Sequence, residues 1–239
     1  MFPDPRKARA NPGGIRWDAW SGSCGADQAG RAVPEDRRVP GALAANRAKA
    51  NAFFLSGSGD PLTGEKAAAF CVDSFLRRPS LKPFALQTIL GFVNNLVMAR
   101  GKPGDNLSFD AAVCFMFKDQ AAWIISGTAA LLMFVDGKLL RKSSAKRYPC
   151  LGVTPSYQAE AESVFAMPRD CRERIAILMC SGISSDALDA ERLERELANA
   201  ETPGAWLEAA TPHMLPEGAA LAVFLPPRKR LFGMEPPPG

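Results

Sequence analysis

Residues 121–139, AAWIISGTAALLMFVDGKL, contain the clearest fold signal in the chain. Two apolar runs flank Gly127-Thr128, as expected for two consecutive strands with a short connection. Asp136-Gly137 follows the second run, and an Asp-Gly pair between two apolar segments is a strong signal for a two-residue hairpin turn. Because the run AALLMFV has no polar residue, we expect its strand to be covered on both faces.

Further apolar runs on both sides of this hairpin predict the other strands. The expected strands are Ala50–Gly57, Ser108–Lys118, Ala121–Gly127, Thr128–Leu140, Ser163–Met167, Ile175–Cys180 and Ala219–Leu225. Apolar residues at spacings of three and four predict helices near 64–78, 81–100 and from Asp189, with a last helix over 206–214. Runs of strands that alternate with runs of helices indicate an α+β fold, with two packed, mainly antiparallel β-sheets flanked by helices.

The apolar stripe of the second predicted helix is wide enough to lie on a sheet. It includes Ile89 and Phe92, which we therefore expect to be well buried. The same expectation applies to apolar residues of the central strands, namely Ile124, Leu131, Met133, Ile177 and Phe224.

The composition is that of one globular domain with polar ends. Hydrophobic residues make up 47% of the 239 residues and charged residues 23%, which are typical globular values. Both ends are rich in proline, glycine and basic residues. We therefore expect a mobile N-terminal arm over 1–40, a folded domain over 41–226, and a disordered, proline-rich basic tail over 227–239.

Charge, hydropathy and cysteine patterns argue against several classes of function. The net charge is only +4, with no basic face interleaved with aromatics, so we expect no nucleic-acid partner. No apolar stretch is long enough for a membrane span, and MFPDPRKARANPGG at the N-terminus has no signal-peptide core, so we expect no membrane partner. The six cysteines have no CxxC spacing, which favours a reducing cytoplasm over disulfides or zinc.

Five phrases, in order along the chain, resemble the type 2C (PPM-type, metal-dependent) serine/threonine protein phosphatases of bacteria. They are KANAFFLSGSGD from Lys49, WIISGTAALLMFVDGKL from Trp123, YPCLG from Tyr148, RIAILMCSGISSDAL from Arg174 and PEGAALAVFL from Pro216. The resemblance covers most of the chain. It implies the αββα sandwich of that family, in which helices flank two packed sheets.

The resemblance also implies a site, because the family holds two divalent metals with aspartates and a glycine carbonyl, and these metals activate the attacking water. Here the corresponding positions are Asn51, Ser56, Gly57, Thr128, Gly182 and Gly218. Mg²⁺ and Mn²⁺ need carboxylate oxygens, because neutral ligands supply no compensating charge. The resemblance therefore implies a degenerate pocket, with no catalytic residue, no bound metal and no cofactor.

The function that follows is a catalytically inactive, pseudophosphatase-like domain that serves as a regulatory or protein-interaction module. Its expected partner is a protein, either phosphorylated or itself a kinase. The alternative is an active metal-dependent serine/threonine protein phosphatase with displaced ligands, in which Asp60, Asp186 and Glu217 would hold Mn²⁺ or Mg²⁺. A third possibility is a structural protein that retains the fold only for packing.

Overall fold

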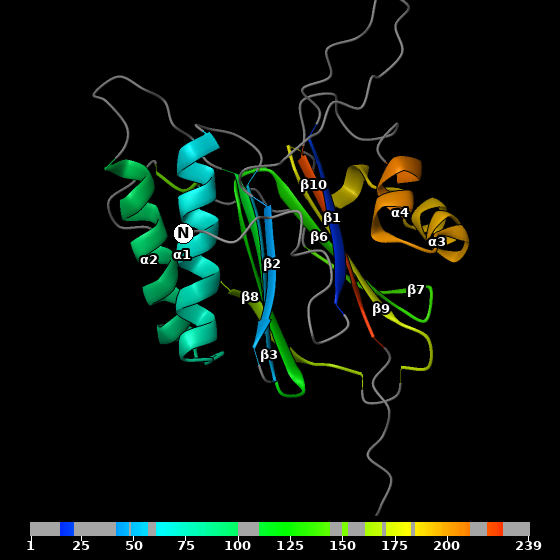
Figure 1. The fold of residues 1–239 in the computed structure, drawn as a ribbon, viewed down its shortest axis with the longest axis horizontal. Helices are drawn as coiled ribbons and strands as arrows, with labels where there is room; N and C mark the ends of the chain where they lie inside the picture. Colours follow the sequence, from blue (N-terminus) through cyan, green and yellow to red (C-terminus); the bar gives the residue numbers. More distant parts are fainter. Residues whose placement is uncertain are drawn as a thin grey trace, which may run out of the picture.

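The structure is a computed structural model that describes ten segments of the chain. These are residues 15–21, 42–47, 49–56, 61–99, 110–143, 150–152, 161–168, 171–182, 185–210 and 219–226. Within them, two five-stranded sheets pack face to face at the centre (Figure 1). Helices α1 (Pro61–Arg77) and α2 (Pro83–Met98) cover one sheet, and α3 (Ala190–Asn199) and α4 (Pro203–Ala210) cover the other. This arrangement confirms the expected α+β sandwich.

Every strand pairing in the two sheets is antiparallel. In spatial order, the first sheet contains β1 (Arg16–Ser21), β10 (Ala219–Leu225), β9 (Ile175–Ser181), β6 (Ala129–Val135) and β7 (Lys138–Lys142). The second sheet contains β2 (Ala42–Arg47), β3 (Ala50–Ser56), β4 (Ala111–Phe117), β5 (Gln120–Ser126) and β8 (Ala161–Ala166). All the expected strands are present with slightly shifted ends, and the segment Thr128–Leu140 forms the β6–β7 hairpin.

Strand β9 is apolar on both of its faces because each face is covered by another layer of the fold. Ile177 and Met179 lie in the core between the two sheets, whereas Leu178 and Cys180 pack in the layer of α3 and α4. Successive residues of a strand point to opposite faces, so both sets must be apolar when both faces are covered. Strands β9 and β10 are therefore buried along their whole length.

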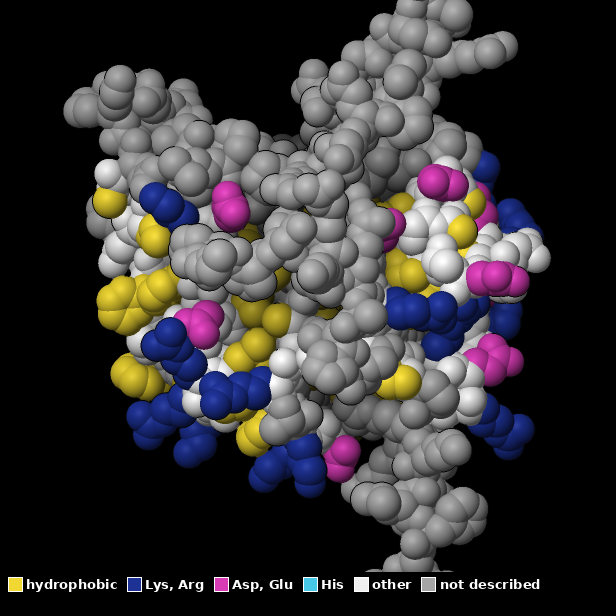
Figure 2. Space-filling model, in the orientation of Figure 1, with side chains coloured by type: hydrophobic (Ala, Val, Ile, Leu, Met, Phe, Trp, Pro, Cys, Tyr) yellow, Lys and Arg dark blue, Asp and Glu magenta, His cyan; other side chains and the backbone are white. Residues whose placement is uncertain are grey.

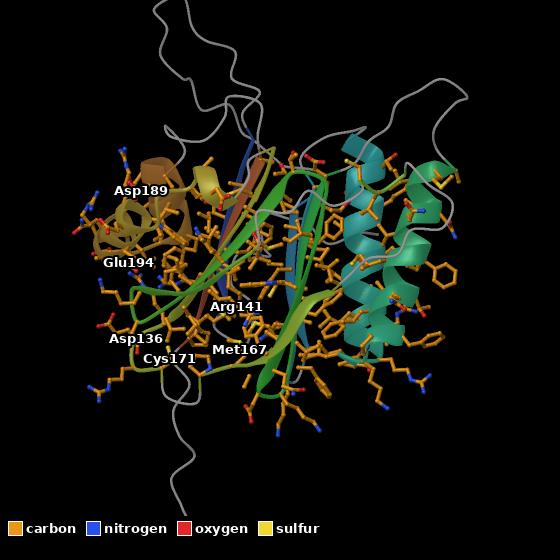
Figure 3. All side chains as sticks on the ribbon, turned by 180° about the vertical axis from the view of Figure 1, so that it is seen from behind. Asp136, Arg141, Met167, Cys171, Asp189 and Glu194 are labelled. Atoms are coloured by element: carbon orange, nitrogen blue, oxygen red, sulfur yellow. The ribbon has the colours of Figure 1, made fainter. Side chains whose placement is uncertain are left out.

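The β6–β7 hairpin has the turn that its Asp-Gly pair predicts. Asp136 (φ +49°) and Gly137 (φ +80°) both have positive φ, as a type I′ turn requires. The Asp136 carboxylate accepts hydrogen bonds from the backbone N–H of Glu173 (2.9 Å) and Arg172 (3.2 Å) and from the Cys171 thiol (3.3 Å) (Figure 3). These donors, the Glu173 N–H foremost, lower the pKa of Asp136.

The same hairpin is also bound to α3. Glu194 accepts hydrogen bonds from the backbone N–H of Leu139 and from Lys138 Nζ, both at 2.8 Å. The Leu139 N–H is the main cause of the lowered pKa of Glu194. Together, Asp136 and Glu194 fix the hairpin to its neighbours, so these carboxylates have a structural role.

Helices α1 and α2 pack against each other and against the β2-β3-β4-β5-β8 sheet. Pro83 occupies the first turn of α2, where a backbone N–H has no intrahelical partner in any case. The buried apolar side chains of α2 recur at spacings of three and four and form one stripe: Leu86, Leu90, Val93 and Val97. Both predicted helices are therefore present.

The structure contradicts the expected burial of Phe92, whose side chain is 59% exposed, and Ile89 is only half-buried. Helix α2 is apolar nearly all round, so its spacing pattern does not select the stripe that faces the sheet. The stripe from Leu86 to Val97 takes that position and turns Phe92 outward. The other expected core residues are buried, namely Ile124, Leu131, Met133, Ile177 and Phe224.

Helix α3 begins where the sequence predicts, because Asp189 caps it. The Asp189 carboxylate accepts a hydrogen bond from the backbone N–H of Arg192 at 3.1 Å. Leu193 and Leu197 are buried on its inner side, as expected. Helix α4 begins earlier than predicted and buries Trp206 completely.

Two edge strands were not predicted, β1 and β2. Residues Arg16–Ser21 lie in the expected mobile arm, but they pair with β10, and Trp17 packs against the core between the sheets. The arm prediction is therefore wrong for these residues; apart from Ile15, the rest of 1–40 lies outside the described residues, and so does 227–239. In the part of the chain that the structure describes, no helix is long and apolar enough to cross a membrane.

Candidate functional site at one end of the sandwich

The two sheets end together in a group of small and polar residues. Ser56 and Ser126, at the ends of β3 and β5, both flank the start of β4. Ser181, at the end of β9, flanks the starts of β6 and β10. Because Gly127-Thr128 connects β5 to β6, these strand ends lie at the same end of the sandwich, which we call the polar end.

Asp110 precedes β4 and lies against the connection between the sheets. Its carboxylate accepts hydrogen bonds from the Thr128 hydroxyl at 2.6 Å and from the Cys150 thiol at 3.3 Å. A Cβ added at Gly127 would overlap this carboxylate, with Asp110 Cγ at 2.6 Å and Cys150 Sγ at 3.0 Å. Gly127 also has φ +66°, so both its backbone angle and the space beside it require glycine.

Cys150 is a hydrogen-bond donor at the polar end. Burial, the hydrogen bond to Asp110 and the charge of that carboxylate raise the pKa of the Cys150 thiol to about 11. The thiol is therefore neutral near pH 7 and a poor nucleophile there. Its position is fixed because the next N–H, of Leu151, donates to Ser126 Oγ at 2.9 Å.

Serine hydroxyls at the polar end form hydrogen bonds with backbone groups of neighbouring segments. Ser56 and Ser181 are both buried. Ser181 Oγ accepts a hydrogen bond from the backbone N–H of Ala219 at 3.2 Å and donates to the carbonyl of the same residue at 3.5 Å. Ser181 thereby joins the end of β9 to the start of β10, and half-buried Gly182 (φ +74°) follows it.

The polar end brings together three of the six predicted pocket residues: Ser56, Thr128 and Gly182. Gly57 and Gly218 lie outside the described residues. Of the three carboxylates proposed for displaced metal ligands, Asp186 lies in a short 3₁₀ helix, η2 (Ser185–Ala187), that contacts β6, and its side chain is exposed. Asp60 and Glu217 are also outside the described residues.

The strand register excludes Asn51 from this group. Asn51 pairs with Asn46 and Met116, near the opposite end of β3, and lies about 17 Å from Ser56 at ~3.3 Å per residue. The resemblance treated both ends of the NAFFLS strand as parts of one pocket. Strand β2 is antiparallel to β3, so the start of β2 lies at the polar end, where Ala42 pairs with Leu55. The start of β3, with Asn51, lies at the opposite end.

In the described segments, the donor groups gathered at the polar end do not suit two Mn²⁺ or Mg²⁺ ions. They are hydroxyls, a thiol and the Asp110 carboxylate, whose oxygens accept hydrogen bonds from Thr128 and Cys150. Hard dications need several carboxylate oxygens to replace their hydration. Among the residues that the structure describes, no group of three or more His, Cys, Asp or Glu side chains could hold a metal ion.

Asp110 is not among the predicted site residues, because it falls inside the expected strand Ser108–Lys118. In the structure, Asp110 directly precedes β4, which begins at Ala111. The available signal is a single carboxylate directly before the wholly apolar run AAVCFMF. A carboxylate in that position faces a strand end rather than a covered sheet.

No family model matches the sequence, and no curated protein matches it. Solved structures do match the fold. PppA, described as a key regulatory component of T6SS in Pseudomonas aeruginosa, is 16% identical, with a TM-score of 0.58 over 89% of this chain and 97% of that chain. The PPM Ser-Thr phosphatase MsPP from Mycobacterium smegmatis, in complex with cacodylate, is 13% identical, with a TM-score of 0.56 over 88% of this chain and 97% of that chain.

The catalytic domain of the serine/threonine phosphatase PstP, in complex with two manganese ions, is 14% identical. Its TM-score is 0.57, over 88% of this chain and 97% of that chain. Identities this low establish the fold alone. The chain has the two-sheet, four-helix sandwich of the PPM-type serine/threonine phosphatases.

Proposed function

We propose that this chain is a catalytically inactive domain with the PPM phosphatase fold, and that it acts as a regulatory or protein-interaction module of the cytoplasm. The donor set of the polar end carries this proposal. Among the described residues there, hydroxyls, glycines and a neutral thiol surround the Asp110 carboxylate, which binds Thr128 and Cys150. The polar end thus resembles a structural junction between the sheets more than a metal centre.

The physical argument is one of charge. Two neighbouring divalent cations repel each other and lose part of their hydration, so several anionic ligands must offset both costs. Serine and threonine hydroxyls supply no such charge, and the Cys150 thiol, with its pKa of about 11, supplies none near pH 7. Without metal ions to lower its pKa, the attacking water is not converted to hydroxide at neutral pH.

An inactive domain acts through what it binds, and we propose a protein partner that is either phosphorylated or itself a kinase. The likeness to PppA, described as a regulatory component, supports a regulatory role. The competing proposal is an active metal-dependent phosphatase in which Asp60, Asp186 and Glu217 replace the usual ligands. The exposed carboxylate of Asp186, beside β6, is the observation that favours it.

One experiment separates these two proposals. Mn²⁺ is titrated into the full chain by calorimetry, and hydrolysis of p-nitrophenyl phosphate and of a phosphoserine peptide is followed with excess Mn²⁺. We expect no binding isotherm for a metal pair and the same turnover as without protein. Mn²⁺-dependent turnover that disappears in Asp186→Asn or Asp60→Asn, while Asp189→Asn retains it, would overturn the proposal in favour of an active enzyme.

A further inference from the structure

The outer surface of helices α1 and α2 exposes three phenylalanine side chains. Phe84 is 81% exposed, Phe92 59% and Phe70 37%. The rings of Phe70 and Phe92 have centroids 6.0 Å apart and connect the two helices. We call these three residues the aromatic face. Figure 2 shows hydrophobic side chains, in yellow, along the side of the molecule where α1 and α2 lie.

The Phe70–Phe92 contact joins the two helices, but the stability of the fold does not explain why Phe84 and Phe92 are so exposed. The stripe from Leu86 to Val97 already covers the sheet, and Phe84 points almost entirely into solvent. Helix α2 has no Asp, Glu, Lys or Arg between Pro83 and Met98, although the solvent side of a surface helix is usually charged. Exposed apolar patches on a folded protein are typical of interaction sites.

Positive charge gathers at one end of the aromatic face. Arg78 and Lys82 are exposed in the connection from α1 to α2, directly before Phe84. Arg77 has an ion pair with Asp73 at 2.8 Å, whereas neither Arg78 nor Lys82 has an ion pair with any residue in the described segments. Dark blue side chains lie below the yellow ones on this side of Figure 2. The uncompensated charge of this end is therefore positive.

We propose that the aromatic face docks an amphipathic α-helix of a protein partner, whose acidic residues lie next to Arg78 and Lys82. This inference rests on the proposed interaction function and gives it a surface and a chemical class of partner. Phe84 and Phe92 are separated by about 12 Å along α2, at ~1.5 Å per residue. That length matches the i, i+4 and i+7 side chains with which an amphipathic helix binds an apolar surface.

Charge favours an acidic partner over a second copy of this chain. A two-fold dimer through the aromatic face would place the same surface on both sides of the interface. In a dimer with parallel helices, Arg78 and Lys82 of both copies would lie at one contact and repel each other. The acidic residues of a partner helix would instead be attracted to Arg78 and Lys82. This attraction also sets the direction in which the partner helix lies along α2.

The test uses two labelled synthetic helices with the same leucine spacing, one flanked at both ends by glutamates and the other by lysines. Their binding to the full chain is measured by fluorescence anisotropy at low and high salt. We expect the glutamate peptide to bind at least about tenfold more tightly, with a preference that weakens as salt rises. Phe84→Ser with Phe92→Ser should reduce its affinity about tenfold or more, whereas Leu140→Ser, an exposed apolar control on β7, should not.

Arg78→Glu with Lys82→Glu should reverse the order of the two peptides, and this charge reversal leaves the aromatic face intact. Equal binding of both peptides, no binding of either, or unchanged binding by the phenylalanine variants would overturn the proposal. Dimerisation that is lost in the phenylalanine variants, measured by sedimentation, would overturn it in favour of a second copy. Mn²⁺-dependent phosphatase activity alongside intact peptide binding would reject only the inactivity claim and leave the docking surface in place.

Discussion

Gly127→Ala is expected to destabilise the protein much more than Gly137→Ala. Both glycines lie between consecutive strands and have positive φ, +66° at Gly127 and +80° at Gly137. They differ in the space around them. A Cβ at Gly137 meets nothing within 4 Å, whereas a Cβ at Gly127 would overlap the Asp110 carboxylate.

The expected loss in the free energy of unfolding is the sum of a backbone contribution and, at Gly127, a hydrogen-bond contribution. A non-glycine residue with left-handed backbone angles costs about 1–2 kcal/mol, and this is the whole cost expected for Gly137→Ala. At Gly127 the Asp110 carboxylate must also move, which breaks its 2.6 Å hydrogen bond with the Thr128 hydroxyl. Since a hydrogen bond to a charged group contributes about 1.5–3 kcal/mol, we expect a loss of about 2.5–5 kcal/mol for Gly127→Ala.

Urea denaturation followed by circular dichroism measures both losses on the same protein. The double variant Asp110→Ala with Gly127→Ala tests the cause, because removing the carboxylate also removes the overlap. Its loss should be smaller than the sum of the two single losses. Equal losses for Gly127→Ala and Gly137→Ala would refute the close approach of Asp110 to the connection between the sheets.

The remaining predictions concern a carboxylate, a helix and a metal. The pKa of Asp136 is lowered chiefly by the Glu173 N–H, so its stabilising effect is present above its unfolded pKa near 4 and is lost as the pH falls through its folded pKa. Asp136→Asn should therefore reduce stability at pH 7 and flatten the acid limb of the stability–pH curve. In α2, Leu90→Ala should cost about 2–5 kcal/mol on urea denaturation, because Leu90 is buried, whereas Phe92→Ala should cost below about 1 kcal/mol. Excess Mn²⁺ should leave the melting temperature unchanged, since any ion that binds only the native state would raise it.

The central strands and α3 could be predicted from sequence because their signals are local. A strand covered on both faces needs a continuous apolar run, and AALLMFV at 129–135 satisfies that rule by itself. The Asp-Gly turn and the Asp189 cap are likewise short-range patterns. Each of these elements is present where the sequence predicts it.

The failures concern features that depend on distant parts of the chain. Strand β1, RWDAWS, has no clear alternation, and it exists because its backbone pairs with β10. The orientation of α2 depends on which of several apolar stripes meets the sheet, so Phe92 was misplaced. The place of Asn51 depends on the β2–β3 register, which no local pattern in NAFFLS reveals.

At the polar end, serine hydroxyls bind backbone groups of the neighbouring segments directly. Clustered carboxylates repel one another when no cation lies between them. Serines in that position bind the backbone instead, as Ser126 does with the N–H of Leu151 and Ser181 with Ala219. The three cores between the layers are made of apolar side chains, which do not depend on the chemistry that the strand ends support. Function must therefore be argued from particular surfaces, and the aromatic face is a surface of the described residues whose apolar exposure the stability of the fold does not explain.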